Sequence, residues 1–210
     1  MVNSLVPTLL LLLAYSGTQA AWSGQSEANY FLDDMLTYPE DNYTLPDFGL
    51  DVDILDDDGF LDYAQYAFSN GSASRFQRRV QRQGSCRNPF GRSFVCDVNL
   101  AGLYVRYSVV RLVKPSSDKF ITAELFVNNG SAVVRMSFLQ GEKSKLESFR
   151  VDDLKMTMRR LPEVLVSADV DKVFAEKTTS KCEQILRRLL EGDYASLLGT
   201  IIGNKTSISI

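Results

Sequence analysis

The spacing of apolar residues near the start of the chain is helical. From Ala28 to Leu36 they recur at i, i+3, i+4, i+7 and i+8, which is typical of a short amphipathic helix. Ser26 is suited to the N-cap and Pro39 follows the end. Residues 60–68 show a similar spacing, so we expect a second short helix there. Both are too short to be stable alone in water and need a surface to pack on.

Farther along the chain, apolar and polar residues alternate as they do in strands. Residues 100–110 place apolar side chains on one face, and residues 145–161 repeat the pattern. Asn129-Gly130 stands between two β-rich runs, which predicts a hairpin turn. We therefore expect a curled antiparallel sheet of about four strands, with an apolar face that needs cover.

A long C-terminal helix is expected to supply that cover. Ser167 can N-cap it, Asp169 and Asp171 fit its first turn, and Gly192 is expected to end it. A further short helix follows at residues 193–202. The predicted fold class is α+β, a curled antiparallel sheet packed on a long C-terminal helix, spanning residues 86–210.

Charge divides the chain abruptly at Arg75. Residues 22–74 carry twelve carboxylates and no cation, whereas the remainder carries 23 cations and 14 carboxylates. Opposite charge in two halves indicates distinct modules or an interaction tail. We therefore divide the mature chain into an acidic leader at 21–74, partly helical and partly extended or disordered, an arginine-rich junction at 75–85, and the α+β domain.

The first twenty residues read as a signal peptide. Their apolar core is too short to span a bilayer, and small residues suit cleavage after Ala20. No later run is long and apolar enough for a membrane span, so we expect a secreted, extracellular protein. Four glycosylation sequons fit that route: Asn42, Asn70, Asn129 and Asn204.

Cysteines usually pair in an oxidising compartment. Cys86 and Cys96 bracket turn-forming residues, which favours a local disulfide. Cys182 is then left over on the apolar stripe of the predicted helix and is expected to be a buried free thiol. Pairing of Cys182 with either of the other two, or between chains, is the alternative.

Most enzyme classes have no support in the residues. The chain has no histidine, which removes serine-histidine-aspartate hydrolysis and histidine metal sites. It has no phosphate-binding glycine loop and no zinc-type spacing. We expect a protein that is not an enzyme and has no cofactor, metal site or nucleic-acid partner. A heparin-like polyanion is the more sensible partner for the arginine cluster.

The order of strands, the run KLESFRVDDLKMTMRRL and the closing amphipathic helix resemble the mite group 7 allergens of the tubular lipid-binding superfamily over about residues 95–202. The resemblance implies a curved sheet wrapped around a long helix, with an apolar groove for a lipid or another hydrophobic ligand. A cystatin-like fold is the competing template.

The first function we consider is a secreted binding module for a hydrophobic ligand. The alternative for every candidate groove residue is that it fills a core. The candidate groove residues are Leu103, Val105, Leu125, Val134, Met136, Phe138, Met156 and Met158.

Two alternatives use the acidic leader. It could bind a basic protein surface, helped by sulfation of tyrosines near its carboxylates. It could also be a removable leader, because Arg78, Arg79 and Arg82 match minimal furin-type sites. Permanent docking of the arginine segment on the acidic leader competes with cleavage.

Overall fold

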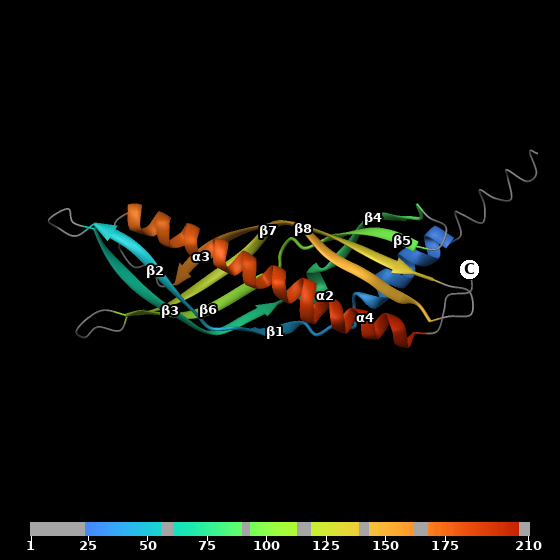
Figure 1. Ribbon diagram of the computed structural model, residues 1–210, viewed down its shortest axis with the longest axis horizontal. Coiled ribbons are helices and arrows are strands. Elements are labelled where there is room, and N and C mark those ends of the chain that lie inside the picture. The colour runs from blue at the N-terminus through green and yellow to red at the C-terminus, as the bar shows by residue number, and fades with distance from the viewer. Residues whose placement is uncertain are drawn as a thin grey trace, which may run out of the picture.

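The computed structural model describes residues 24–55, 61–89, 93–112, 119–138, 143–161 and 168–205, which form an α+β fold with a long helix lying across one antiparallel sheet (Figure 1). A first helix spans residues 24–35. The strands are β1 (Asn42–Leu45), β2 (Phe48–Leu55), β3 (Leu61–Ser74), β4 (Gln81–Arg87), β5 (Ser93–Asn99), β6 (Tyr104–Leu112), β7 (Lys119–Ser137) and β8 (Lys145–Leu161). The other helices are α2 (Phe76–Arg79), α3 (Ala168–Leu189), the π-helix η1 (Leu190–Tyr194) and α4 (Ala195–Asn204). Within the described residues, every helix is too short or too polar to cross a bilayer.

Strand β7 organises the sheet. Its first half pairs with β6, its second half pairs with β5, and β8 runs along its other side. The strand order is β1-β3-β6-β7-β5-β4, with β2 also paired to β3 and β8 to β7. The described sheet therefore has eight strands, all paired antiparallel, and the expected count of about four is wrong.

A bend that crosses β7 and β8, called the corner below, explains part of the difference between the observed and the expected number of strands. In β7 the buried positions are odd-numbered up to Val127 and even-numbered from Ala132, and β8 makes the same switch between Val151 and Leu154. Register shifts at these places add a residue, which reverses the inward face of a strand. Beside the corner, the segment 100–103 separates β5 from β6. The chain therefore runs along β7 once in this region but forms two strands.

Asn129-Gly130 lies at this corner, and the predicted hairpin turn there is wrong. Both residues belong to β7, which continues without reversal. Gly130 instead allows neighbouring side chains to lie close to its backbone. A β-carbon on it would lie 2.9 Å from Cγ1 of Val127 and 3.0 Å from Cβ of Leu100. The amide of Leu100 donates to the Gly130 carbonyl at 2.9 Å. The glycine is therefore needed for packing between strands.

The acidic segment contributes the remaining strands. The first helix is confirmed, and its buried residues include Leu32 and Met35. The second expected helix, at residues 60–68, is wrong, because its described part lies in β3 between β2 and β6. Ala64, Tyr66 and Phe68 point inward at the two-residue period of a strand. Residues 42–45 and 48–55 pair with β3 as β1 and β2.

The long C-terminal helix is confirmed, but Gly192 does not end it. The chain passes from α3 through η1 into α4. Gly192 has no positive φ, so its backbone continues the helix rather than capping it. Leu190, Tyr194, Leu198 and Ile202 continue the buried stripe at intervals of four residues.

Candidate ligand-binding site around helix α3

Helix α3 and the π-helix η1 that continues it cover the open edge of β8 with charged side chains. Glu183 Oε1 accepts a hydrogen bond from the Met156 amide at 2.9 Å, and Glu191 Oε1 accepts one from the Val151 amide at 2.8 Å. Arg187 donates to the Val151 carbonyl. The three side chains are spaced four residues apart and therefore share one face of the helix. They satisfy backbone groups that an edge strand would otherwise leave bare.

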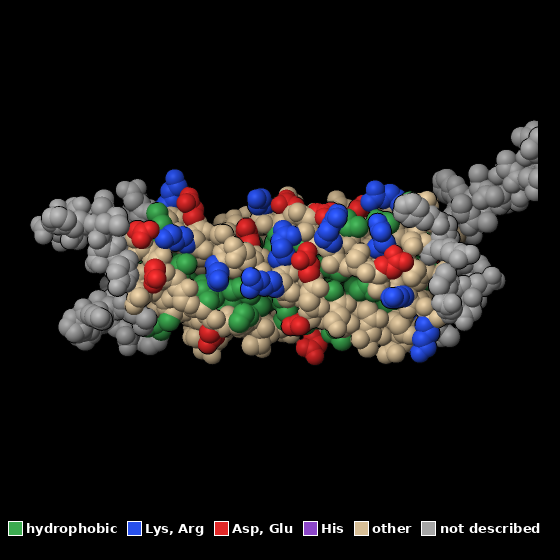
Figure 2. Space-filling model, in the orientation of Figure 1, with side chains coloured by type: hydrophobic (Ala, Val, Ile, Leu, Met, Phe, Trp, Pro, Cys, Tyr) green, Lys and Arg blue, Asp and Glu red, His purple; other side chains and the backbone are tan. Residues whose placement is uncertain are grey.

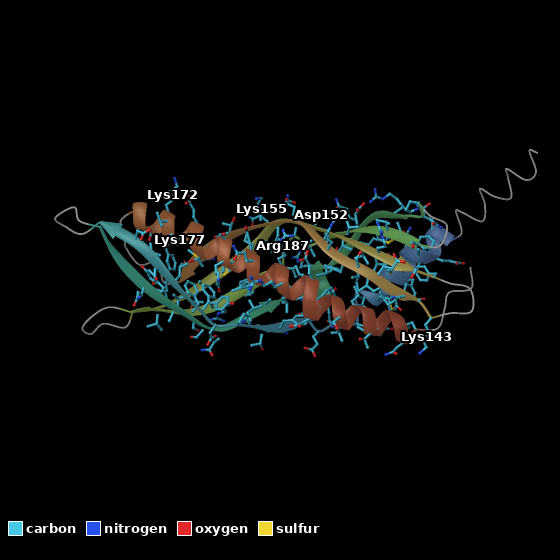
Figure 3. All side chains as sticks on the ribbon, viewed as in Figure 1. Lys143, Asp152, Lys155, Lys172, Lys177 and Arg187 are labelled. Atoms are coloured by element: carbon cyan, nitrogen blue, oxygen red, sulfur yellow. A yellow bond between two sulfur atoms is a disulfide. The ribbon has the colours of Figure 1, made fainter. Side chains whose placement is uncertain are left out.

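The opposite flank of α3 binds the edge of β2. Lys177 Nζ donates to the Asp51 carbonyl at 3.1 Å and pairs with the Asp53 carboxylate at 3.2 Å. Figure 3 shows Lys177 and Arg187 at successive positions along the helix. Helix α3 therefore bridges two edges of the curled sheet.

Two open grooves flank α3. The β8 groove, between α3 and β8, has a volume of about 400 Å³, and the β2 groove, between α3 and β2, about 390 Å³. Figure 2 shows hydrophobic side chains between the charged ones on this face. The β8 groove is lined by Met156, Thr157, Met158, Ala175, Glu176, Thr179, Ser180 and Glu183. The β2 groove is lined by Leu50, Glu176, Lys177, Ser180, Lys181 and Gln184.

The candidate groove residues named from the sequence all belong to the hydrophobic core or pack against it. Seven are buried and Met158 is partly buried. The α3 side of the corner holds Leu103, Val105, Leu125, Met156 and Met158, whereas the other side holds Val134, Met136 and Phe138.

Only Met156 and Met158 of this set line the β8 groove. The Phe138 ring instead packs edge-on against Phe31 of the first helix, with centroids 5.2 Å apart. The α3 residues that line one or both of the grooves were not identified from the sequence. Their small side chains at Ala175, Thr179 and Ser180 were the available signal, because larger residues there would fill the grooves.

The underside of α3 carries a hydroxyl and a thiol within an apolar stripe. Thr178 is fully buried, and its Oγ1 has no hydrogen-bond partner. Cys182 is a buried free cysteine, as expected. Burial, followed by the nearby Glu183 charge, raises the pKa of the Cys182 thiol to about 12. The thiol is therefore protonated and unreactive in the folded protein.

The expected disulfide between Cys86 and Cys96 is present and joins β4 to β5. The Cys86 amide also donates to Asn29 Oδ1 of the first helix at 2.7 Å. The disulfide, the two strands and the helix therefore form one connected region at the end of the sheet away from α3.

The arginine-rich junction is packed into the fold. Phe76 and Val80 are buried, whereas Arg78 and Arg79 are exposed. Arg82 forms an ion pair with Asp33 of the first helix at 2.7 Å. Processing at the arginines remains a prediction, and Ala20 lies outside the described residues.

Several carboxylates of the acidic segment bind other parts of the fold. Asp34 pairs with Lys205 near the C-terminus at 3.2 Å, and Asp41 accepts a hydrogen bond from the Gln77 amide at 3.0 Å. Together with Asp33 and Asp53, they bind the acidic segment to later elements. The sequon side chains Asn42, Asn70, Asn129 and Asn204 are exposed.

The structure thus brings the grooves, the buried Thr178 hydroxyl and two methionines together around one half of α3. No protein-family model matches the chain, and no curated protein matches it. Residues and geometry are therefore the basis for assigning a function.

Proposed function

We propose that the protein is a secreted, non-enzymatic binding protein that holds a lipid or another hydrophobic ligand between the sheet and α3. The observation that carries the proposal is the way in which α3 is held. Its hydrogen bonds run to the strand edges of β2 and β8, while its underside rests on apolar side chains. Non-directional apolar contacts can be exchanged for contacts with a ligand without leaving backbone groups unpaired.

The grooves support this proposal by their size and lining. A volume of about 400 Å³ lies within the usual range of small-molecule sites. Met156 and Met158 stand on the β8 side. Methionine side chains adapt readily to different apolar shapes, so they can move to admit a ligand.

The architecture supports the resemblance to the tubular lipid-binding superfamily only at the level of a long helix on a large, unclosed sheet. The two alternative functions have less support. Asp33, Asp34 and Asp53 form ion pairs within the fold, which lowers the charge that the acidic segment offers to a basic partner. Burial of Phe76 and Val80 restrains the segment in which cleavage was predicted.

Native mass spectrometry of the protein secreted from eukaryotic cells tests the proposal directly. We expect a population with adducts that organic solvent extracts and that have lipid masses. The intact mass also reports glycans, sulfation and leader removal. A spectrum without adducts, combined with no binding of an added apolar fluorophore, would contradict the proposal.

A groove-filling variant locates the site. Ala175→Phe places a large side chain in the β8 groove and is expected to weaken binding of the fluorophore N-phenylnaphthylamine about tenfold, equivalent to about 1.4 kcal/mol. Ser196→Phe adds the same ring at an exposed position of α4 and serves as the control. Equal affinities in the two variants would place the ligand elsewhere.

A further inference from the structure

Thr178 interrupts the apolar stripe of α3. Phe174 lies one turn before it, Cys182 lies one turn after it, and all three are buried against the sheet. A helical threonine commonly donates to the carbonyl four residues earlier. Thr178 Oγ1 makes no hydrogen bond, so the folded protein keeps a buried polar group unsatisfied. An apolar residue of the same shape would avoid this loss of stability.

The position of Thr178 relates this unsatisfied group to the proposed ligand site. Ala175 and Thr179, on one side of it, line the β8 groove, while Lys177 and Lys181, on the other, line the β2 groove. Thr178 therefore lies on the underside of α3 between the two openings. Thr178 is fully buried and lines neither groove, so a ligand would reach its hydroxyl by displacing the apolar contacts beneath this half of the helix.

We propose that Thr178 Oγ1 is the polar anchor of the ligand site, and that it selects an elongated apolar molecule bearing a neutral oxygen acceptor, such as an ester or a ketone. This inference rests on the proposed function. The hydroxyl donates to the ligand oxygen, which satisfies it without placing a charge in the apolar interior.

The surroundings disfavour a free carboxylate as the anchored group. A buried carboxylate needs a cation or several donors. The nearest lysines in sequence, Lys177 and Lys181, line the open β2 groove rather than the buried underside, and Lys177 binds Asp51 and Asp53 there. The Cys182 thiol beside the underside offers one weak donor. A single hydroxyl matches a neutral acceptor best.

The test compares two competitors of similar length, methyl palmitate and heptadecane, for displacement of N-phenylnaphthylamine from lipid-extracted protein. The wild type is expected to bind the ester about fivefold more tightly than the hydrocarbon, as one neutral hydrogen bond allows. Thr178→Val keeps the shape of the side chain and removes the hydroxyl. It is expected to abolish the preference, leave heptadecane affinity within about twofold, and raise the melting temperature, since it removes the unsatisfied group.

Thr178→Ser, which retains the hydroxyl, and Thr200→Val, at an exposed position of α4 outside both grooves, are expected to keep the preference. A preference that survives in Thr178→Val overturns the anchor while leaving the proposed function standing. Failure of the fluorophore to bind the wild type overturns both. If Thr178→Val does not fold, the comparison of Thr178→Ala with Thr178→Ser decides in the same way.

Discussion

A β-carbon on Gly71 would lie 2.3 Å from Cε1 of Tyr107, because the fully buried Tyr107 ring covers this glycine. The Tyr107 hydroxyl donates to the Pro46 carbonyl at 3.0 Å, so the ring cannot shift without losing that bond. Gly71→Ala is therefore expected to lower the free energy of unfolding by about 2–3 kcal/mol through overpacking. Urea denaturation measures the change.

Gly49→Ala is the matched control for this prediction. Gly49 is an exposed strand residue, and a β-carbon on it would lie 3.9 Å from its nearest neighbour, the Tyr66 carbonyl oxygen. We expect a change within about 0.5 kcal/mol. Similar losses in both variants would show that the Tyr107 ring does not restrict Gly71.

Loss of the Glu183 carboxylate should loosen α3 from β8. Glu183→Ala leaves the Met156 amide without its acceptor, which is expected to cost about 1–3 kcal/mol. Hydrogen exchange at that amide should also accelerate. Glu176→Ala, at an exposed position of the same helix, should change stability by no more than about 0.5 kcal/mol. An unchanged exchange rate in Glu183→Ala would contradict the role of the carboxylate.

The three cysteines are expected to behave differently. Replacing Cys86 and Cys96 together by alanine should cost about 2–3 kcal/mol and leave the fold intact, because the disulfide closes a short loop. Cys182 should resist alkylation until the protein unfolds, since burial raises its thiol pKa to about 12. Non-reducing peptide mapping with timed alkylation checks both points. Rapid labelling of Cys182 in the folded protein would refute its burial.

The arginine-rich junction should resist a furin-type protease in the folded protein. Phe76 is fully buried, so extending the segment in a protease site requires local unfolding. Phe76→Ala, which loses about 3–5 kcal/mol of packing, should speed cleavage at the arginines, whereas Phe76→Leu should have a smaller effect. Timed digestion followed by mass spectrometry gives the rates. Wild-type cleavage as fast as that of a free peptide covering residues 75–83 would contradict this prediction.

Alkaline pH should destabilise the protein through two partly buried tyrosines. Burial, followed by the hydrogen bond to Glu124, raises the pKa of Tyr104 to about 12, and burial with the Glu40 charge raises that of Tyr43 to about 12. The unfolded chain loses these protons near pH 10. The unfolding free energy should therefore fall between about pH 10 and 12.

Denaturant unfolding measured from pH 6 to 11.5 checks this dependence. Tyr104→Phe should reduce the alkaline slope, whereas Tyr30→Phe, at a side chain that is 76% exposed, should not. With no histidine in the chain, stability should change little between pH 6 and 8. A slope unaffected by Tyr104→Phe would contradict the contribution of this tyrosine.

Features set by nearby residues could be predicted from the sequence. The first helix and α3 follow from helical spacing, and the Cys86–Cys96 disulfide follows from a short turn-forming loop. The free Cys182 follows from its place on the apolar stripe of α3. In each case the pattern that decides the structure lies within about twenty residues.

Features set by contacts between distant segments could not be predicted. Asn129-Gly130 has the composition of a turn, but β8 pairs with both residues on one side and the Leu100 amide binds the Gly130 carbonyl on the other, so the strand continues. Ala64 and Phe68 fit a helix equally well until pairing with β2 and β6 selects the strand. Part of the candidate site could be predicted, because the inward positions of Met156 and Met158 follow from the alternation of apolar and polar residues. The groove residues of α3 could not, because they depend on how the helix packs on the sheet.

The bridging position of α3 also determines how the protein must be made. The ribosome synthesises β2 and β8 before α3, so the edges of both strands stay uncovered until the helix has been made. Glu191 follows the end of β8 by thirty residues, which corresponds to about 2–6 s of translation. During that interval these edges of β2 and β8 remain unpaired, and an unpaired edge is the kind of surface that joins other chains. Chaperones that shield strand edges should therefore assist its folding, and truncation before α3 should yield aggregates rather than a smaller folded protein.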